Sequence, residues 1–232
     1  MDELTALVTG GTRGIGRAVA EAFASEGSTV VVGARDGDTV EETIDHLEES
    51  GATAAGVRTD VRDEFDVERL VETASRTGAN GGIDVVVAAA GVYHGGAGAT
   101  PTDRESYSAF DDHWRINGRG VFATIREALP HLNEGARVLV PTGAVARNGK
   151  PGYGSYAVSK ATAEAVARGF AADTDYVVGC LDPGQVGTDL SGGTGREPAD
   201  VAPMFVWAAT EASAEDVDGG VVGLREWKRA TR

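Results

Sequence analysis

The chain has 232 residues, enough to bury one sizeable core, and its 36 Asp and Glu against 21 Lys and Arg give a formal net charge of −15. That sign of charge excludes a nucleic-acid surface, and no leading apolar run or membrane-length apolar stretch is present, so we expect a cytoplasmic protein without a membrane partner. Cys180 is the only cysteine, which excludes an internal disulfide and a multi-cysteine metal site.

The acidic residues are spread along the chain, and the lysines are only Lys150, Lys160 and Lys228. At low salt such a charge destabilises the compact state through self-repulsion, whereas molar salt shortens the screening length to ~3 Å. The composition therefore predicts a solvated acidic surface and a halophilic source.

Short apolar runs alternate with amphipathic segments along the whole chain. The runs are continuous, as in parallel strands that are buried on both faces. They lie at 4–9, 28–34, 54–59, 83–90, 136–141, 176–181 and 221–224, and helical segments lie between them at 16–27, 41–50 and 67–78. This alternation predicts an α/β fold in a single domain over 1–232, a Rossmann-like doubly wound parallel sheet of about seven strands with helices on both faces.

The first predicted strand leads directly into the glycine-rich segment TGGTRGIG at 9–16. Gly10, Gly14 and Gly16 would let the backbone turn tightly, approach a pyrophosphate and pack the next helix close to the sheet. The N-terminus of that helix attracts phosphates. Placed between the first strand and the first helix, the segment predicts a dinucleotide site.

The end of the second predicted strand indicates which dinucleotide binds. A NAD site would place Asp or Glu here for the ribose 2′-hydroxyl, but this chain has Ala34 followed by Arg35, and Arg13 lies in the glycine loop. Two guanidinium groups suit a 2′-phosphate. Against this, Asp36 follows directly, and either arginine could be a surface cation. The prediction is NADP(H) in preference to NAD(H).

Five segments, in order and over nearly the whole chain, resemble the short-chain dehydrogenase/reductase family in its compact one-domain form. They are TGGTRGIG (9–16), TDVRD (59–63), WRINGRGVF (114–122), YAVSK (156–160) and DPGQVGTDL (182–190). The resemblance implies an NADP(H)-dependent oxidoreductase that transfers a hydride between nicotinamide and a carbonyl or secondary alcohol. It also implies a small-molecule substrate, no metal, and a homodimer or homotetramer.

The resemblance further implies which residues do the chemistry. Tyr156 would move a proton at the substrate oxygen, Lys160 together with oxidised nicotinamide would lower the pKa of that phenol, and Asn117 would hold a relay water. Asp60 would hold the adenine amine, and Val61 would line the adenine pocket. The full set of implied cofactor-binding residues is Gly10, Thr12, Arg13, Gly14, Ile15, Gly16, Arg35, Asp60, Val61, Ala90, Gly91, Tyr156, Lys160, Pro183, Gly184, Val186 and Thr188.

Three departures from the family's pattern matter. AAAG at 88–91 replaces the family's NNAG, so the asparagine amides that brace the central strands are absent, and only nine residues separate Thr188 from Pro198, where the family has a longer substrate lid. The family's catalytic serine, thirteen residues before the tyrosine, is replaced by Gly143. Thr142 is one residue early, so we expect its side chain to point to the opposite face.

The missing serine leaves two interpretations open. Loss of one hydrogen-bond donor to a developing oxyanion costs ~10²–10³ in rate, so the protein is either a slow reductase or a nucleotide-binding protein of this fold that acts as a sensor or partner subunit. His94 and His113 could touch substrate, although surface histidines are commoner. We expect Cys180 to pack within its strand, and a helix at 198–210 to lie in the core or at a subunit interface.

Overall fold

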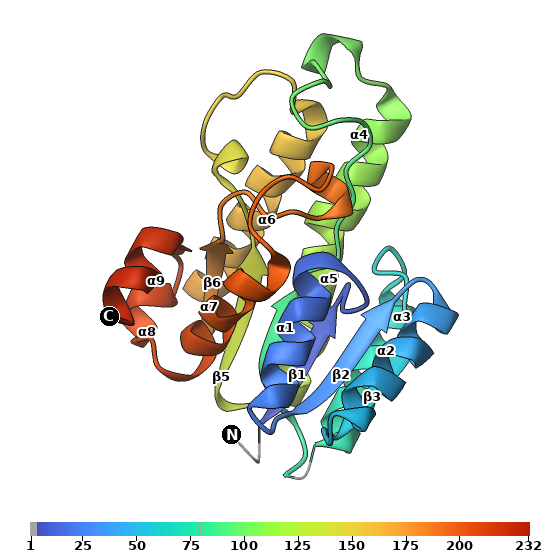
Figure 1. The fold of residues 1–232 in the computed structure, drawn as a ribbon, viewed down its shortest axis with the longest axis vertical. Helices are drawn as coiled ribbons and strands as arrows, with labels where there is room; N and C mark the ends of the chain where they lie inside the picture. Colours follow the sequence, from blue (N-terminus) through green and yellow to red (C-terminus); the bar gives the residue numbers. More distant parts are fainter. Residues whose placement is uncertain (1–3, 79) are drawn as a thin grey trace.

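The computed structural model describes residues 4–78 and 80–232 (Figure 1). Within these residues, seven parallel strands form one sheet in the order β3-β2-β1-β4-β5-β6-β7, which confirms the predicted doubly wound fold. The strands are β1 (Thr5–Thr9), β2 (Thr29–Ala34), β3 (Ala54–Arg58), β4 (Ile83–Ala88), β5 (Leu132–Pro141), β6 (Val177–Asp182) and β7 (Val221–Gly223).

Helices cover both faces of the sheet. They are α1 (Gly14–Ser25), α2 (Gly37–Glu49), α3 (Glu64–Thr77), α4 (Tyr107–His113), α5 (Gly120–Ala128), α6 (Gly154–Asp173), α7 (Pro198–Thr210), α8 (Ala214–Val217) and α9 (Leu224–Ala230). The predicted helix at 198–210 is α7, and its Met204 and Phe205 are fully buried in the core. None of the helices in the described part of the chain is both long and apolar enough to span a bilayer.

Each face of the sheet carries its own apolar core, because neighbouring residues of a strand point to opposite faces. In β1, Leu7 packs in the cluster that includes side chains of α3, α5 and α6, whereas Ala6 and Val8 pack in the cluster that includes α1, α2 and α7. All three residues have zero exposure, which explains why the strands are continuous apolar runs. Cys180 is also buried in its strand, as expected.

The strand order reverses beside β1, whose neighbours β2 and β4 lead the chain in opposite directions across the sheet. In such sheets a crevice opens at the carboxyl ends of the strands on either side of this point. A cavity of about 1010 Å³ lies there. The fold thus gathers the loops after β1, β2, β4, β5 and β6 around one site.

Candidate active site

The cavity at the carboxyl ends of the strands collects nearly all of the site residues expected from the sequence. Asp60 and Asn117 are the two that do not line it. Those that do are Gly10, Thr12, Arg13, Gly14, Ile15, Gly16, Arg35, Val61, Ala90, Gly91, Tyr156, Lys160, Pro183, Gly184, Val186 and Thr188. We call the part formed by 9–16, Arg35 and Val61 the nucleotide end, after the dinucleotide that the sequence predicts there, and the part formed by Tyr93, Gly143, Tyr153 and Tyr156 the substrate end, after the predicted place of the substrate.

At the nucleotide end, the glycine loop makes contacts that leave no room for side chains. Gly10 has φ of +69°, and a Cβ there would lie 2.7 Å from the Cα of Ala90. The Cα of Gly16 faces the carbonyl group of Gly10, so α1 packs directly onto the loop. In the described structure α1 begins without a side-chain cap and without an acidic residue in its first turn. Its first N–H groups are therefore available to phosphate oxygens, and the residues fit a dinucleotide.

Two arginines, Arg13 in the glycine loop and Arg35 after the second strand, line the nucleotide end of the cavity. Arg35 lines the cavity and is exposed, and Arg13 Nη1 lies 4.0 Å from Asp189 Oδ2 at a weak surface contact. Asp36 is the acidic residue whose position argued against NADP(H) in the sequence. It is the N-cap of α2, and its side chain accepts hydrogen bonds from two backbone N–H groups in the first turn of that helix. Its carboxylate therefore has a structural role that a ribose hydroxyl would have to share.

The carboxylate of Asp60, expected at the adenine amine, is held instead by Arg62. Arg62 Nε lies 3.0 Å from both oxygens of Asp60, and Nη2 lies 2.6 Å from Oδ2. These hydrogen bonds lower the pKa of Asp60. An adenine amine would have to compete with this guanidinium for the same oxygens, and Val61 is the residue of this segment that lines the cavity.

Tyr156 and Lys160 both face the cavity from the first turns of α6. Lys160 Nζ donates to the carbonyl oxygen of Pro141, the last residue of β5, at 2.9 Å. Burial lowers the pKa of Lys160 to about 8, and burial raises the pKa of Tyr156 to about 12. In this structure Lys160 therefore does not offset the effect of burial on the phenol, and Tyr156 keeps its proton at neutral pH.

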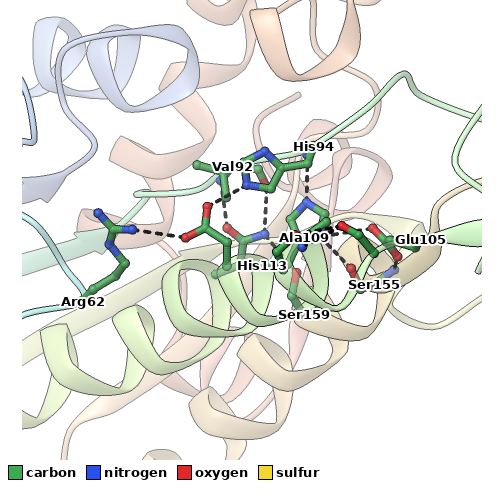
Figure 2. Close-up of polar contacts among 12 residues, drawn as sticks. Arg62, Val92, His94, Glu105, Ala109, His113, Ser155 and Ser159 are labelled. Carbon is green, nitrogen blue, oxygen red and sulfur yellow. Dashed lines mark hydrogen bonds and ion pairs between the residues drawn. The ribbon is translucent and has the colours of Figure 1, made fainter.

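Asn117 lies in a π-helical turn, Trp114–Arg119, that joins α4 to α5. Its Oδ1 accepts the N–H of Val92 at 2.8 Å, and its Nδ2 donates to the carbonyl of Val92 and to Ser159 Oγ, both at 2.9 Å (Figure 2). The side chain is buried behind the cavity wall. Asn117 therefore ties the loop after β4 to the residue that precedes Lys160.

Gly143 leaves space where the family has a serine. Its backbone is extended, with φ of −160°, and a Cβ there would meet no atom within 4 Å. The hydroxyl of Thr142 donates to the buried Glu164 Oε1 at 2.7 Å, and so it points away as strand alternation predicts. Ser155 Oγ is engaged by His113 Nδ1 at 2.7 Å. Neither neighbouring hydroxyl occupies the position of the missing serine.

Two ion pairs made by the partly exposed Arg147, in the turn after Gly143, were not predicted. Arg147 contacts both Glu164 on α6 and Asp182 at the end of β6. Arg147 lies 17 residues before Glu164 and 35 residues before Asp182, so the sequence spacing gives no local signal of these contacts. These two ion pairs attach the loop after β5 to α6 and to the segment that begins Asp182-Pro183.

Aromatic side chains form one wall of the substrate end. The ring of Tyr93 stacks on Tyr156 with centroids 4.5 Å apart, and it lies nearly parallel to Tyr153 at 6.2 Å. Lys150 Nζ lies 4.9 Å from the ring centroid of Tyr153. Sequence reasoning missed this wall. The spacing of Tyr153 and Tyr156, about one helical turn, was the available signal.

The lid over the cavity, residues 188–198, is short and closely hydrogen-bonded. Gly187 N–H donates to the carbonyl of Arg196 at 2.7 Å, and Arg196 N–H donates to that of Gln185 at 3.0 Å. Thr188 begins a tight 3₁₀ turn, and Gly14 of the glycine loop lies opposite it. Thr188 thus brings the lid against the glycine loop at the nucleotide end.

The two histidines considered as substrate contacts do not line the cavity. His94 is partly exposed, and its Nε2 lies 2.6 Å from Asp112 Oδ2. His113 has zero exposure, so its expected surface position is wrong. The reason is tertiary: His113, at the end of the largely exposed α4, is covered by the start of α6 and by the loop that contains His94.

Comparison with known proteins agrees with this geometry. A family model described as short chain dehydrogenase matches residues 4–198. A versicolorin reductase of Emericella nidulans is 30% identical over 97% of this chain and 95% of its own length. A hydroxynaphthalene reductase-like protein of Metarhizium guizhouense is 31% identical over 80% of this chain and 69% of its own. An alcohol dehydrogenase of Thermococcus sibiricus, solved with 5-hydroxy-NADP, is 29% identical with a TM-score of 0.83 over 95% of each chain.

Proposed function

Because the chain belongs to the short-chain dehydrogenase/reductase family, we propose that it is an NADP(H)-dependent reductase of a small carbonyl compound. The observation that carries the proposal is that one cavity contains the glycine loop, Arg13 and Arg35 together with the phenol of Tyr156 and the ammonium of Lys160. NADPH oxidation across a panel of ketones and aldehydes in molar KCl tests it. Equal affinity for NADPH and NADH would contradict the cofactor preference.

The chain's own residues would divide the work as follows. NADPH, when bound, supplies the hydride. Gly10, Gly14 and Gly16 admit its pyrophosphate, Arg13 and Arg35 hold the 2′-phosphate, and Pro183, Gly184, Val186 and Thr188 cover the nicotinamide half. The remaining cofactor residues proposed are Thr12, Ile15, Asp60, Val61, Ala90 and Gly91, with Tyr156 and Lys160.

Proton transfer falls to Tyr156. Because burial raises the pKa of its phenol to about 12, Tyr156 holds a proton at neutral pH and can give it to the carbonyl oxygen as hydride arrives. The cation of Lys160 then stabilises the phenolate that forms. Gly143 offers no side-chain donor to that oxygen, which predicts slow turnover.

The substrate end favours a flat aromatic or fused-ring ketone. Tyr93, Tyr153 and Tyr156 give this end of the cavity an aromatic lining. Aromatic substrates interact favourably with aromatic side chains. A relative of the chain is named as a hydroxynaphthalene reductase-like protein, which fits a bicyclic substrate. A comparison of kcat/KM for 1-tetralone and cyclohexanone tests this; the aliphatic ketone should be the poorer substrate.

A second function is favoured by the vacancy at Gly143 and by the engagement of the Thr142 and Ser155 hydroxyls. In this alternative the protein binds the nucleotide but has weak or lost chemistry, and serves as a sensor or partner subunit. Tight NADPH binding without reduction of any carbonyl, in either the natural protein or the Gly143→Ser variant, would support it.

We also propose a homodimer or homotetramer. Phe110, Trp114, Phe122 and Val158 are large apolar side chains with 42–46% exposure on α4, α5, α6 and the π-helical turn between α4 and α5. Light scattering in molar KCl would measure the mass.

A further inference from the structure

The start of α6, which places Tyr156, is capped by a residue from a distant part of the chain. The N-cap residue, Tyr153, makes no side-chain cap. Instead, Glu105 Oε2 accepts the backbone N–H of Ser155, across 50 residues of sequence (Figure 2). A carboxylate at this end of a helix satisfies an unpaired N–H group and complements the helix dipole.

His113 fixes the same turn of α6 through the Ser155 side chain. Its Nδ1 lies 2.7 Å from Ser155 Oγ and 3.5 Å from Glu105 Oε1. On the other side of the ring, Nε2 accepts the backbone N–H of His94 at 2.9 Å. Because a backbone N–H can only donate, Nε2 carries no proton, and the ring donates from Nδ1 as a neutral group.

The loop that contains His94 is also held through the side chain of His94, which contacts Asp112. Asp112 joins the His94 ring to Arg62 Nη1, at 2.6 and 3.2 Å respectively. The residue before His94, Tyr93, stacks on Tyr156 and donates its hydroxyl to the carbonyl of Gly152 at 3.1 Å. The helix turn that carries Tyr156 and the ring packed against it are therefore tied to one cluster.

Glu105 is held in this cluster at a cost. Its side chain is 6% exposed, and Oε1 has no hydrogen-bond partner among the described residues. Buried polar atoms without partners are rare and destabilising, so a group retained in this state calls for an explanation. The contact of Oε2 with the turn next to Tyr156 supplies one.

We propose that Glu105 and His113 are positioning residues for the proton donor. They hold the backbone and side chain of Ser155, and through them the phenol of Tyr156, at the distance that proton transfer requires. This inference rests on the proposed reductase function. A displacement of about 1 Å at a reacting group can cost ~10² in rate. Glu105 and His113 contact Ser155 and the backbone of His94 rather than the nucleotide end, so nucleotide binding should not depend on these two side chains.

The test compares Glu105→Ala with Glu105→Gln, and adds His113→Phe, which removes both ring hydrogen bonds. We expect Glu105→Ala and His113→Phe each to lower kcat by about tenfold to a hundredfold, with NADPH Kd and ketone KM changed by less than about twofold. Glu105→Gln should restore most of kcat, because the amide oxygen can still accept the Ser155 N–H. Asp103→Ala is the matched control, since Asp103 is an exposed neighbour in the turn before Glu105.

The outcomes separate positioning from simple support of the fold. A Glu105→Ala protein that melts at a lower temperature but keeps kcat within about twofold would overturn the proposal. So would a Glu105→Gln protein as slow as Glu105→Ala. If Glu105→Ala does not fold, Glu105→Gln and His113→Phe decide the question by the same kcat measurement. If the unmodified protein reduces no carbonyl, the proposed function itself fails and takes this inference with it.

Discussion

The two ends of the cavity are built in different ways. The nucleotide end is mostly backbone: a segment of eight residues, 9–16, supplies the turn, the close approach and the helix N-terminus. The substrate end is mostly side chains from separate segments, including Tyr93 after β4 and Tyr153 and Tyr156 at the start of α6, around the open position at Gly143. A site made by local backbone geometry is visible as a motif, whereas a site made by converging side chains depends on the whole topology.

This difference predicts that a substitution at one end of the cavity should leave the function of the other end nearly unchanged. Tyr156→Phe should have the largest effect. Removing the proton donor should reduce kcat by ~10²–10⁴ while NADPH binding is retained, since the ring and its stacking on Tyr93 remain. Steady-state rates and fluorescence titration with NADPH measure the two effects. Comparable losses of binding and turnover would show that the two ends are not independent.

Gly143→Ser should improve the substrate end without changing the nucleotide end. The extended backbone accepts any residue, and the new Cβ meets no atom within 4 Å, so the hydroxyl can reach the substrate oxygen. A donor there is worth ~10²–10³ in kcat. Thr142→Val is the comparison variant: it should leave kcat nearly unchanged and lower the melting temperature, because it removes a partner of buried Glu164. Loss of activity in Thr142→Val would instead show that its hydroxyl serves the reaction.

Arg35→Ala should affect only the nucleotide end. Loss of a charged hydrogen bond to the 2′-phosphate should weaken NADPH binding by roughly 1.5–3 kcal/mol and leave NADH binding nearly unchanged. Isothermal titration with both nucleotides measures the difference. Arg58→Ala, at an exposed arginine outside the cavity lining, is the control.

The reductive kcat should depend on pH through two groups at the substrate end and beside it, Tyr156 and Lys160. Reduction needs the proton on Tyr156 and the cation of Lys160, and the pKa of Lys160 is lowered by burial to about 8. The reductive kcat should therefore be level below pH 8 and fall as pH rises through that value, by about tenfold per unit at most. A profile that declines only near pH 12, where Tyr156 loses its proton, would mean that the lysine charge is not needed.

Salt should have the smallest effect, and it should change nucleotide binding without changing the rate of the reaction. Arg13 and Arg35 are exposed, so molar KCl should raise the KM for NADPH a few-fold by screening and leave kcat unchanged. The melting temperature should rise over the same range, as repulsion within a chain of charge −15 is screened. A melting temperature that is flat in KCl would remove the argument for a halophilic source.

The sequence alone was enough to predict the parallel strands of the sheet and the glycine-rich segment of the nucleotide end. Continuous apolar runs marked all seven strands to within a few residues, and the predicted helix at 198–210 coincides with α7. The glycine loop, the arginine after the second strand and the four-residue spacing of Tyr156 and Lys160 are also local patterns. Local patterns can be read because backbone conformation and side-chain periodicity act over a few residues.

Only the tertiary structure decided how the substrate end is held together. The direction of the Thr142 hydroxyl, the burial of His113 and the cap that Glu105 provides all depend on partners 22 to 50 residues away. Even Asp60, whose partner Arg62 is close in sequence, has its carboxylate oriented by a fold that also brings Asp112 to that arginine. Such contacts follow from how the chain crosses between strands, and one sequence carries no local signal of which distant side chains will meet.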